Sequence, residues 1–338
     1  MAAGAALFVP AAYARSYSLF LCGLFILGTG QALLQTAANP YITILGPNES
    51  AAQRNSFMGV CNKLAGIASQ RLVGPLLLLN ADVILQKLRQ MTPQEKTTAL
   101  NEMSLRIVSP YWIMTGSLLF IALIMWLVKL PVVNEEESNN DESGETKASI
   151  WLYPNLMLGV LALFCAEGLE SITSYYIIPF GQSMGFSTAA SQPFVDYIIY
   201  AMLAGYLCGI IFIPKYISQS RALSICAAIG ICLSVAAIAS TGFTAVTCII
   251  LMGFCNALNW PSIWPLAIKG LGKYTKTAAA LLIMAIAGDA VFPVLYAQLN
   301  TYFGIKAGIA LLGFLYAVIL YFAMTGYKKK RWGVKEYL

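Results

Sequence analysis

Long apolar segments recur along nearly the whole chain, separated by shorter polar stretches. A helix of roughly 20 apolar residues crosses a bilayer, at about 1.5 Å per residue. Residues 1–13 are apolar but too short to cross alone. The pattern predicts membrane-spanning helices near residues 16–38, 56–80, 107–130, 155–180, 194–214, 222–240, 244–267, 277–298 and 303–326. A β-barrel would instead show short alternating segments, so we expect an all-α membrane protein.

Two polar stretches interrupt this pattern. Residues 81–106 are compatible with a helix, in which Pro93 opens a short amphipathic turn. Residues 132–150 are acidic and of low complexity, which is typical of a flexible linker. The predicted domains are a helical bundle over 1–131, a cytoplasmic linker over 132–150, a six-helix bundle over 151–331 and a cytoplasmic tail over 332–338.

Three amide side chains share one face of the helix expected near 16–38. Gln31, Gln35 and Asn39 lie at i, i+4 and i+8. Amides in hydrocarbon are costly unless they face protein, water or a ligand. A similar proline-containing stretch recurs later, and at the offset that overlays the two prolines Gln35 lies over Asn256. Such a repeat in both halves indicates a transporter whose binding site lies between them.

The two halves are unequal in this alignment. Residue 1 lies over residue 222, so residues 151–221 have no counterpart in the first half. A chain of two six-helix repeats would lack about two helices at its N-terminus. We therefore expect an N-terminally truncated sequence with about ten of twelve helices.

Composition and charge placement agree with a membrane protein. Hydrophobic residues make up 59% and charged residues 11% of the chain, whereas a soluble domain has about twice that share of charge. The net charge of +6 gathers beside the spans and gives no indication of nucleic-acid binding. These clusters comprise Lys215, Arg221, Lys269, Lys273, Lys276, Lys328, Lys329, Lys330 and Arg331. By the positive-inside rule they predict a multi-pass protein of the inner (plasma) membrane with a cytoplasmic C-terminus, and they can meet anionic lipid headgroups.

Several chemistries find no support in the sequence. All eight cysteines lie within apolar segments without a CxxC motif, and the chain has no histidine. This argues against His-based catalysis and most zinc sites. The chain also has no GxxxxGK motif for ATP-driven transport and no GxSxG motif of a hydrolase. We expect no enzyme activity, no cofactor and no metal.

Three stretches carry a resemblance to a known family. Residues 4–12 (GAALFVPAA) and 36–47 (TAANPYITILGP) resemble the third and fourth helices of the fucose:proton symporters and their glucose/galactose relatives, and residues 256–272 resemble their tenth helix and following loop. These proteins belong to the major facilitator superfamily. The resemblance implies twelve helices in two bundles, alternating access, and proton- or sodium-coupled uptake of a hexose such as glucose, galactose or fucose.

The resemblance also assigns individual positions. Gln35 occupies the place of a membrane carboxylate linked to sugar and proton in the fucose symporters, where the glucose/galactose branch often has glutamine. Asn62 is similar to a sugar-facing asparagine of the fifth helix, and Trp260 to an aromatic residue before the tenth-helix proline. The first-helix aspartate linked to proton coupling would lie before residue 1.

Amide and aromatic side chains suit a sugar. An amide both donates and accepts hydrogen bonds, and an indole stacks on apolar C–H faces. The predicted sugar-binding residues are Gln35, Asn39, Asn62, Asn256, Asn259, Trp260 and Trp264. Alternatively, the amides only bridge helices, Asn39 satisfies carbonyls freed by Pro40, and Trp264 belongs to the interfacial belt.

Three intramembrane carboxylates are candidates for cation coupling. Glu167 and Glu170 lie at i, i+3, and neighbouring carboxylates at low dielectric can hold a proton near neutrality. The alternative is an ion pair with Lys63 or Arg71. Asp289 near midspan could line a cavity or pair with a lysine.

Together these features predict a secondary active sugar transporter that works as a monomer in the lipid bilayer. The alternative is a truncated, non-transporting remnant or a membrane sugar receptor, since an incomplete bundle could not close both gates. On that ground we expect this form not to perform coupled uptake.

Overall fold

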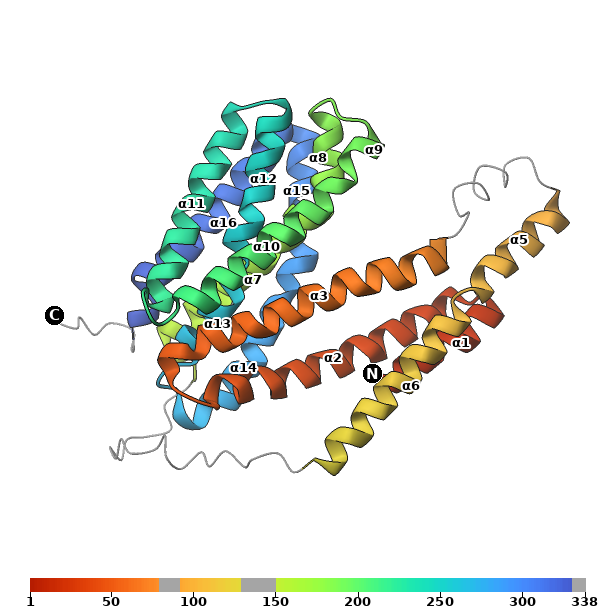
Figure 1. Ribbon diagram of the computed structural model, residues 1–338, viewed down its shortest axis with the longest axis horizontal. Coiled ribbons are helices and arrows are strands. Elements are labelled where there is room, and N and C mark those ends of the chain that lie inside the picture. The colour runs from red at the N-terminus through yellow and green to blue at the C-terminus, as the bar shows by residue number, and fades with distance from the viewer. Residues whose placement is uncertain (79–91, 129–149, 330–338) are drawn as a thin grey trace. The chain divides into compact units, whose positions relative to one another are not determined.

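The computed structural model describes residues 1–78, 92–128 and 150–329, and their regular structure is helical (Figure 1). The chain divides into two compact units. The first unit contains Met1–Ala37 and Leu64–Val132, and the second contains Ala38–Lys63 and Val133–Leu338. The expected linker, apart from residue 150, and the tail 332–338 lie outside the described residues.

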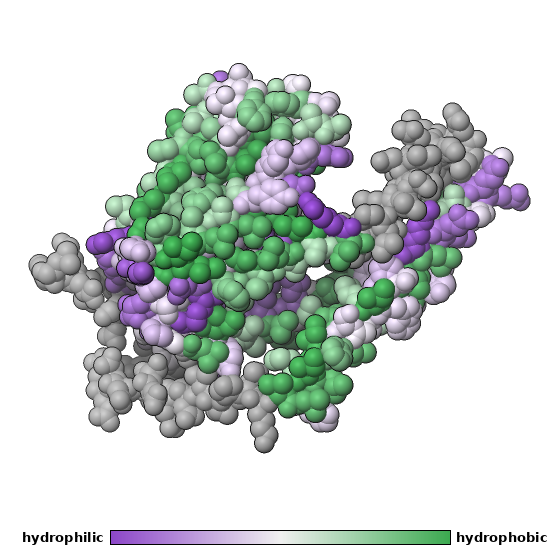
Figure 2. Space-filling view, in the orientation of Figure 1, coloured by the Kyte–Doolittle hydropathy of each residue, from purple (hydrophilic) through white to green (hydrophobic). Residues whose placement is uncertain are grey.

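The structure contains several long apolar helices, as expected for an all-α membrane protein. Eight helices of the described residues are long and apolar enough to cross a bilayer: Tyr17–Thr43, Gln94–Leu127, Pro154–Tyr175, Thr188–Phe212, Gln219–Ala239, Gly242–Ile268, Thr275–Phe303 and Ile305–Lys328. The predicted fold class is confirmed. Large apolar side chains such as Ile211, Val235 and Phe243 are exposed, and Figure 2 shows hydrophobic residues over much of the visible outer face of the second unit. Such a surface is typical of contact with lipid.

One expected span has a more polar composition than the rest. The helix near 56–80 is α3 (Ala51–Leu78), which at 28 residues is long enough to cross. It is not among the eight apolar helices of the described chain. Its polar side chains lower its hydropathy, and they include the cations Arg54, Lys63 and Arg71.

The first unit contains α1 (Ala2–Ala14), most of α2 (Tyr17–Ile44), the second part of α3, α5 (Pro93–Leu105) and α6 (Val108–Leu127). Phe8 of α1 stacks on Tyr111 of α6 with 4.2 Å between ring centroids and meets Phe20 of α2 edge-on at 4.6 Å. As the sequence predicts, Pro93 opens a helix. Thr92 caps it, because its hydroxyl accepts from the Glu95 N–H while the Glu95 carboxylate accepts from the Thr92 N–H.

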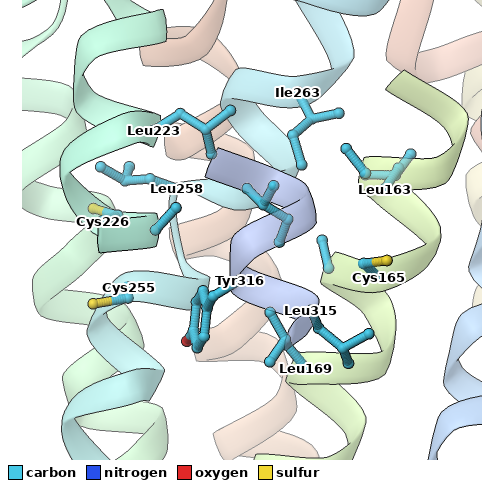
Figure 3. Packing of buried hydrophobic residues seen from close by; sticks show 14 of the residues in the cluster. Leu163, Cys165, Leu169, Leu223, Cys226, Cys255, Leu258, Ile263, Leu315 and Tyr316 are labelled. Carbon is cyan, nitrogen blue, oxygen red and sulfur yellow. The ribbon is translucent and has the colours of Figure 1, made fainter. Parts of the chain in front are cut away.

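The second unit is built around α7 (Pro154–Tyr175), which contacts α12 (Gly242–Asn256), α13 (Asn259–Ile268), α15 (Gly288–Phe303) and α16 (Ile305–Met324). Its core is apolar, and Figure 3 shows Leu169 of α7 packed near Leu315 and Tyr316 of α16. The remaining helices are η3 (Ile150–Leu152), α8 (Ile177–Ser183), α9 (Thr188–Ser191), α10 (Pro193–Phe212), α11 (Gln219–Ala239), η4 (Gly272–Tyr274), α14 (Thr275–Met284), η5 (Ala285–Ala287) and η6 (Gly326–Lys328).

Two of the expected spans are divided. The 244–267 span breaks between α12 and α13, at Ala257 and Leu258. Pro261 explains this break, because it has no N–H to donate to the Ala257 carbonyl. The 277–298 span changes to a 3-10 turn, η5, between α14 and α15. Helix α2, in contrast, continues through Pro40 to Ile44.

The segment Ala38–Lys63 of the second unit has polar contacts within itself and one to α10. The Arg54 guanidinium donates to the carbonyls of Ile42 at 3.0 Å and Thr43 at 2.7 Å, at the C-terminal end of α2. A cation there meets the negative end of the helix dipole. The Gln53 side-chain amide donates to the Ile210 carbonyl at 2.7 Å, so this first turn of α3 is joined to α10.

Close approach of α15 to α7 depends on a glycine. A Cβ atom placed on Gly288 would lie 2.0 Å from the Phe164 carbonyl oxygen, which is backbone and cannot turn aside. Gly116 on α6 has no atom within 4 Å of the same position.

We expect Gly288→Ala to lower the thermal unfolding midpoint of the detergent-solubilised protein. The strain should correspond to about 1–3 kcal/mol, as for other overpacked sites. Gly116→Ala is the control and should leave the midpoint unchanged or raise it slightly, because alanine favours helix. Equal midpoints for the two variants would contradict this contact between α7 and α15.

Candidate functional site

Asn256 is the centre of a buried hydrogen-bond network in the second unit. It is the last residue of α12 and is 3% exposed. Its side-chain nitrogen donates to the Thr173 hydroxyl of α7 at 3.1 Å. Its side-chain oxygen accepts from the Tyr316 hydroxyl of α16 at 2.7 Å and from the Asn259 amide at 3.4 Å. The network therefore joins α7, α12, α13 and α16 at the break between α12 and α13.

Three polar atoms of α13 remain without a hydrogen-bond partner in the described part of the chain. They are the side-chain oxygen of Asn259, the hydroxyl of Ser262 and the indole nitrogen of Trp264. All three residues are buried. Buried polar groups are normally partnered by protein, water or ligand, so these three atoms are candidates for a bound water or a polar ligand.

The two tryptophans of α13 stack on each other. The ring centroids of Trp260 and Trp264 are 5.4 Å apart and their planes differ by 23°. Trp264 is fully buried, whereas Trp260 is half-buried against the core. In this structure Trp260 is the member of the pair that retains accessible surface.

The second unit also contains a set of charged residues. The Lys63 ammonium of α3 and the Glu170 carboxylate of α7 form an ion pair, with 19% and 31% of their side chains exposed. The sequence left open whether Glu170 would pair with Lys63 or Arg71, and the structure selects Lys63.

Two more carboxylates lie near this ion pair. Glu167 interacts electrostatically with Glu170, Asp289 and Lys63. The Ser171 hydroxyl lies within hydrogen-bonding reach of Asp289. We call Lys63, Glu167, Glu170 and Asp289 the charged cluster. With all four ionised, three negative charges face one positive charge. In a low-dielectric interior such an excess favours uptake of a cation or a proton.

The remaining predicted site residues lie elsewhere. Gln35 is half-buried on α2, in the first unit. Asn39 is 4% exposed, and its side-chain nitrogen has no partner among the described residues. Asn62, on α3 next to Lys63, is exposed. The structure thus brings together Asn256 with Asn259, Trp260 with Trp264, and the three carboxylates; the ligand roles of all these residues remain predictions.

Several residues of these groups were not singled out from the sequence. Thr173 and Tyr316 complete the Asn256 network, and Tyr206 lies within electrostatic range of Glu167 and Glu170. A threonine or tyrosine in an apolar helix is common and gives little signal. Within the described residues, no group of His, Cys, Asp and Glu is arranged to hold a metal ion.

Comparison with known proteins decides the family. The sequence profile described as Major Facilitator Superfamily matches residues 97–293. The chain belongs to this superfamily. It is 31% identical over 330 residues to a glucose/galactose transporter of Brucella abortus biovar 1 (strain 9-941), which covers 97% of this chain and 76% of the relative. It is 28% identical over 296 residues to an L-fucose-proton symporter of Escherichia coli (strain K12), covering 86% and 67%.

A solved structure of the superfamily has the same fold. The crystal structure of the E. coli fucose:proton symporter FucP matches with a TM-score of 0.83 and 27% sequence identity, over 95% of this chain and 80% of that one. A second FucP structure, described as outward, matches with a TM-score of 0.82. The resemblance read from the sequence is confirmed at the level of family and fold.

The Asn256 network gives a prediction for stability. Tyr316→Phe removes the hydroxyl that donates to Asn256 and should lower the free energy of unfolding by about 1 kcal/mol. Tyr302→Phe is the matched control, because Tyr302 is 79% exposed. Both midpoints can be measured by thermal unfolding in detergent. A Tyr316→Phe protein as stable as the Tyr302→Phe protein would show that the bond contributes nothing.

Proposed function

We propose that this protein is a secondary active transporter that couples uptake of a hexose to the entry of a proton or sodium ion by alternating access. Its relatives are named glucose/galactose transporter and L-fucose-proton symporter. The polar groups of the membrane helices support the same function. Amides and a stacking surface suit a sugar, and unbalanced carboxylates suit a cation.

The charged cluster is the observation that carries the coupling part of the proposal. In the described part of the chain, Lys63 is the one cation of the cluster, and it faces the three carboxylates of Glu167, Glu170 and Asp289. A bound proton or cation would reduce the excess negative charge, so its affinity depends on how close Lys63 stays to Glu170. Lys63 comes from α3 and Glu170 from α7. A movement of one helix against the other would therefore change cation affinity, which is the link that a symporter needs.

The sugar part of the proposal assigns contacts to Gln35, Asn39, Asn62, Asn256, Asn259, Trp260 and Trp264. Asn256 already uses both ends of its amide within the protein. We therefore propose that Asn256 stabilises the backbone at the α12–α13 break. The second N–H of its side-chain amide is then available to donate to a sugar hydroxyl. Trp260 supplies the stacking face and Asn259 a free acceptor.

Gln35→Ala should weaken hexose binding by about 1–3 kcal/mol, because a sugar hydroxyl would lose its polar partner. Binding of glucose, galactose and fucose can be followed by tryptophan fluorescence or calorimetry. Gln298→Ala, at an exposed glutamine of α15, is the control. Equal affinities for both variants would reject Gln35 as a contact.

Coupling can be separated from binding by two assays in liposomes. The unaltered chain is measured first, because the sequence alone predicts no coupled uptake by this form. If it accumulates sugar under a proton or sodium gradient, Glu167→Gln should abolish that accumulation while leaving exchange of labelled for unlabelled sugar in place, because exchange needs no net cation movement. Lys63→Gln should also impair accumulation, and Lys63→Gln with Glu170→Gln should recover part of it by removing the unpaired charge.

Asp196→Asn, at a carboxylate in the first turn of α10, is the control for these variants. Gradient-driven accumulation that survives in Glu167→Gln would remove this cluster from the coupling mechanism. Sugar binding by the unaltered chain without accumulation under any gradient would instead support a membrane sugar receptor.

A further inference from the structure

A cavity of about 730 Å³ opens at the end of the second unit where α10 leads into α11 and where α16 ends. Its walls come from five places in the chain: η1, Pro214 of the α10–α11 connection, the first turns of α11, the end of α13, and the end of α16 with η6. It includes neither the Asn256 network nor the charged cluster. A ligand there would be distinct from the transported sugar and cation.

The walls of this cavity are strongly cationic. Arg221, Lys269 and Lys328 line it from three different elements, and Glu49 is the only carboxylate among the lining residues. Across the described ranges none of the three cations forms an ion pair. Cations gathered around one hollow without counter-charges repel each other, and an anion between them removes that repulsion.

Hydroxyl and amide groups add donors beside these cations. Ser218, Ser220 and the amide residues Asn48 and Gln219 line the cavity. Ser224 also lines it, but its hydroxyl donates to the Ser220 carbonyl. Ser218 caps α11 by accepting from the Arg221 N–H, so the start of a 21-residue helix also faces this region. A tetrahedral group with several oxygens fits a set of cations, hydroxyls and first-turn N–H groups better than a single carboxylate does.

We propose that this cavity binds a phosphate-bearing anion, either the headgroup of an anionic phospholipid or a free phosphate compound. The volume exceeds what inorganic phosphate alone needs, which leaves room for a headgroup or an organic remainder. The location at a basic end of the membrane helices suits a lipid. Because η1 lies in the α2–α3 connection and the other walls in the second half of the sequence, the anion would hold these segments together.

The test uses the full chain, purified in neutral detergent, and its thermal unfolding followed by tryptophan fluorescence. One arm adds sodium phosphate against sodium chloride of equal ionic strength. The other adds short-chain phosphatidylglycerol against short-chain phosphatidylcholine. The proposal expects a saturable rise of the unfolding midpoint with phosphate or with phosphatidylglycerol. A response to phosphate identifies a free anion as sufficient, and a response to phosphatidylglycerol alone identifies a lipid.

Variants locate the effect in the cavity. Arg221→Gln with Lys269→Gln should weaken the response about tenfold or more, since two charge-assisted contacts are lost. The double variant Arg221→Lys with Lys269→Arg keeps both charges and should retain the response. It still tests the proposal if the glutamine variant does not fold. Lys215→Gln removes a cation from the same α10–α11 connection, outside the cavity lining, and should behave as the unaltered protein.

Two results would overturn the proposal. The first is the absence of a saturable response to both probes in the unaltered protein. The second is a loss of response in Lys215→Gln as large as in the double glutamine variant, which would assign the effect to general surface charge.

Discussion

The low dielectric constant of the membrane interior governs the arrangement of the second unit. A polar group there must find a partner or it lowers stability by several kcal/mol. Asn256 finds three partners from three other helical segments. Those bonds form where α12 ends and α13 begins, so the irregular backbone is surrounded by protein. Pro261 divides this span, and the bonds of Asn256 then connect the break to α7 and α16.

The same constraint acts more strongly on charge. Burial of an ion without a counter-ion is far less favourable than burial of an amide. Glu170 is held by Lys63, yet Glu167 and Asp289 lie in its electrostatic range without further cations among the described residues. A bundle that served only structure would gain stability by replacing these carboxylates with apolar residues. Their presence is the physical argument for a cation-dependent function.

The hydropathy pattern predicts much of the fold, whereas the site depends on contacts between residues that are distant in the sequence. The spans expected near 194–214 and 303–326 correspond to α10 and α16 within a few residues. The break at Ala257 and the 3-10 turn at 285–287 leave the apolar pattern unchanged and were not predicted. Asn256 was recognised as unusual, but its partner Tyr316 is 60 residues away. Periodicity cannot reveal such a partner, and the choice of Lys63 over Arg71 likewise depends on how α3 packs.

The amide network and the charged cluster share one turn of α7. The Thr173 hydroxyl, which accepts from Asn256, itself lies 3.1 Å from the Glu170 carbonyl oxygen. Glu170 in turn holds Lys63 through its side chain. Groups in one hydrogen-bond and ion-pair network typically couple by 0.5–3 kcal/mol. The Thr173 hydroxyl also lies 2.8 Å from the Leu169 carbonyl oxygen, so the turn of α7 that carries Glu170 is in direct contact with the α12–α13 break. Proximity alone does not establish coupling, but here the contacts are continuous, because Thr173 of the Asn256 network also contacts the Glu170 backbone.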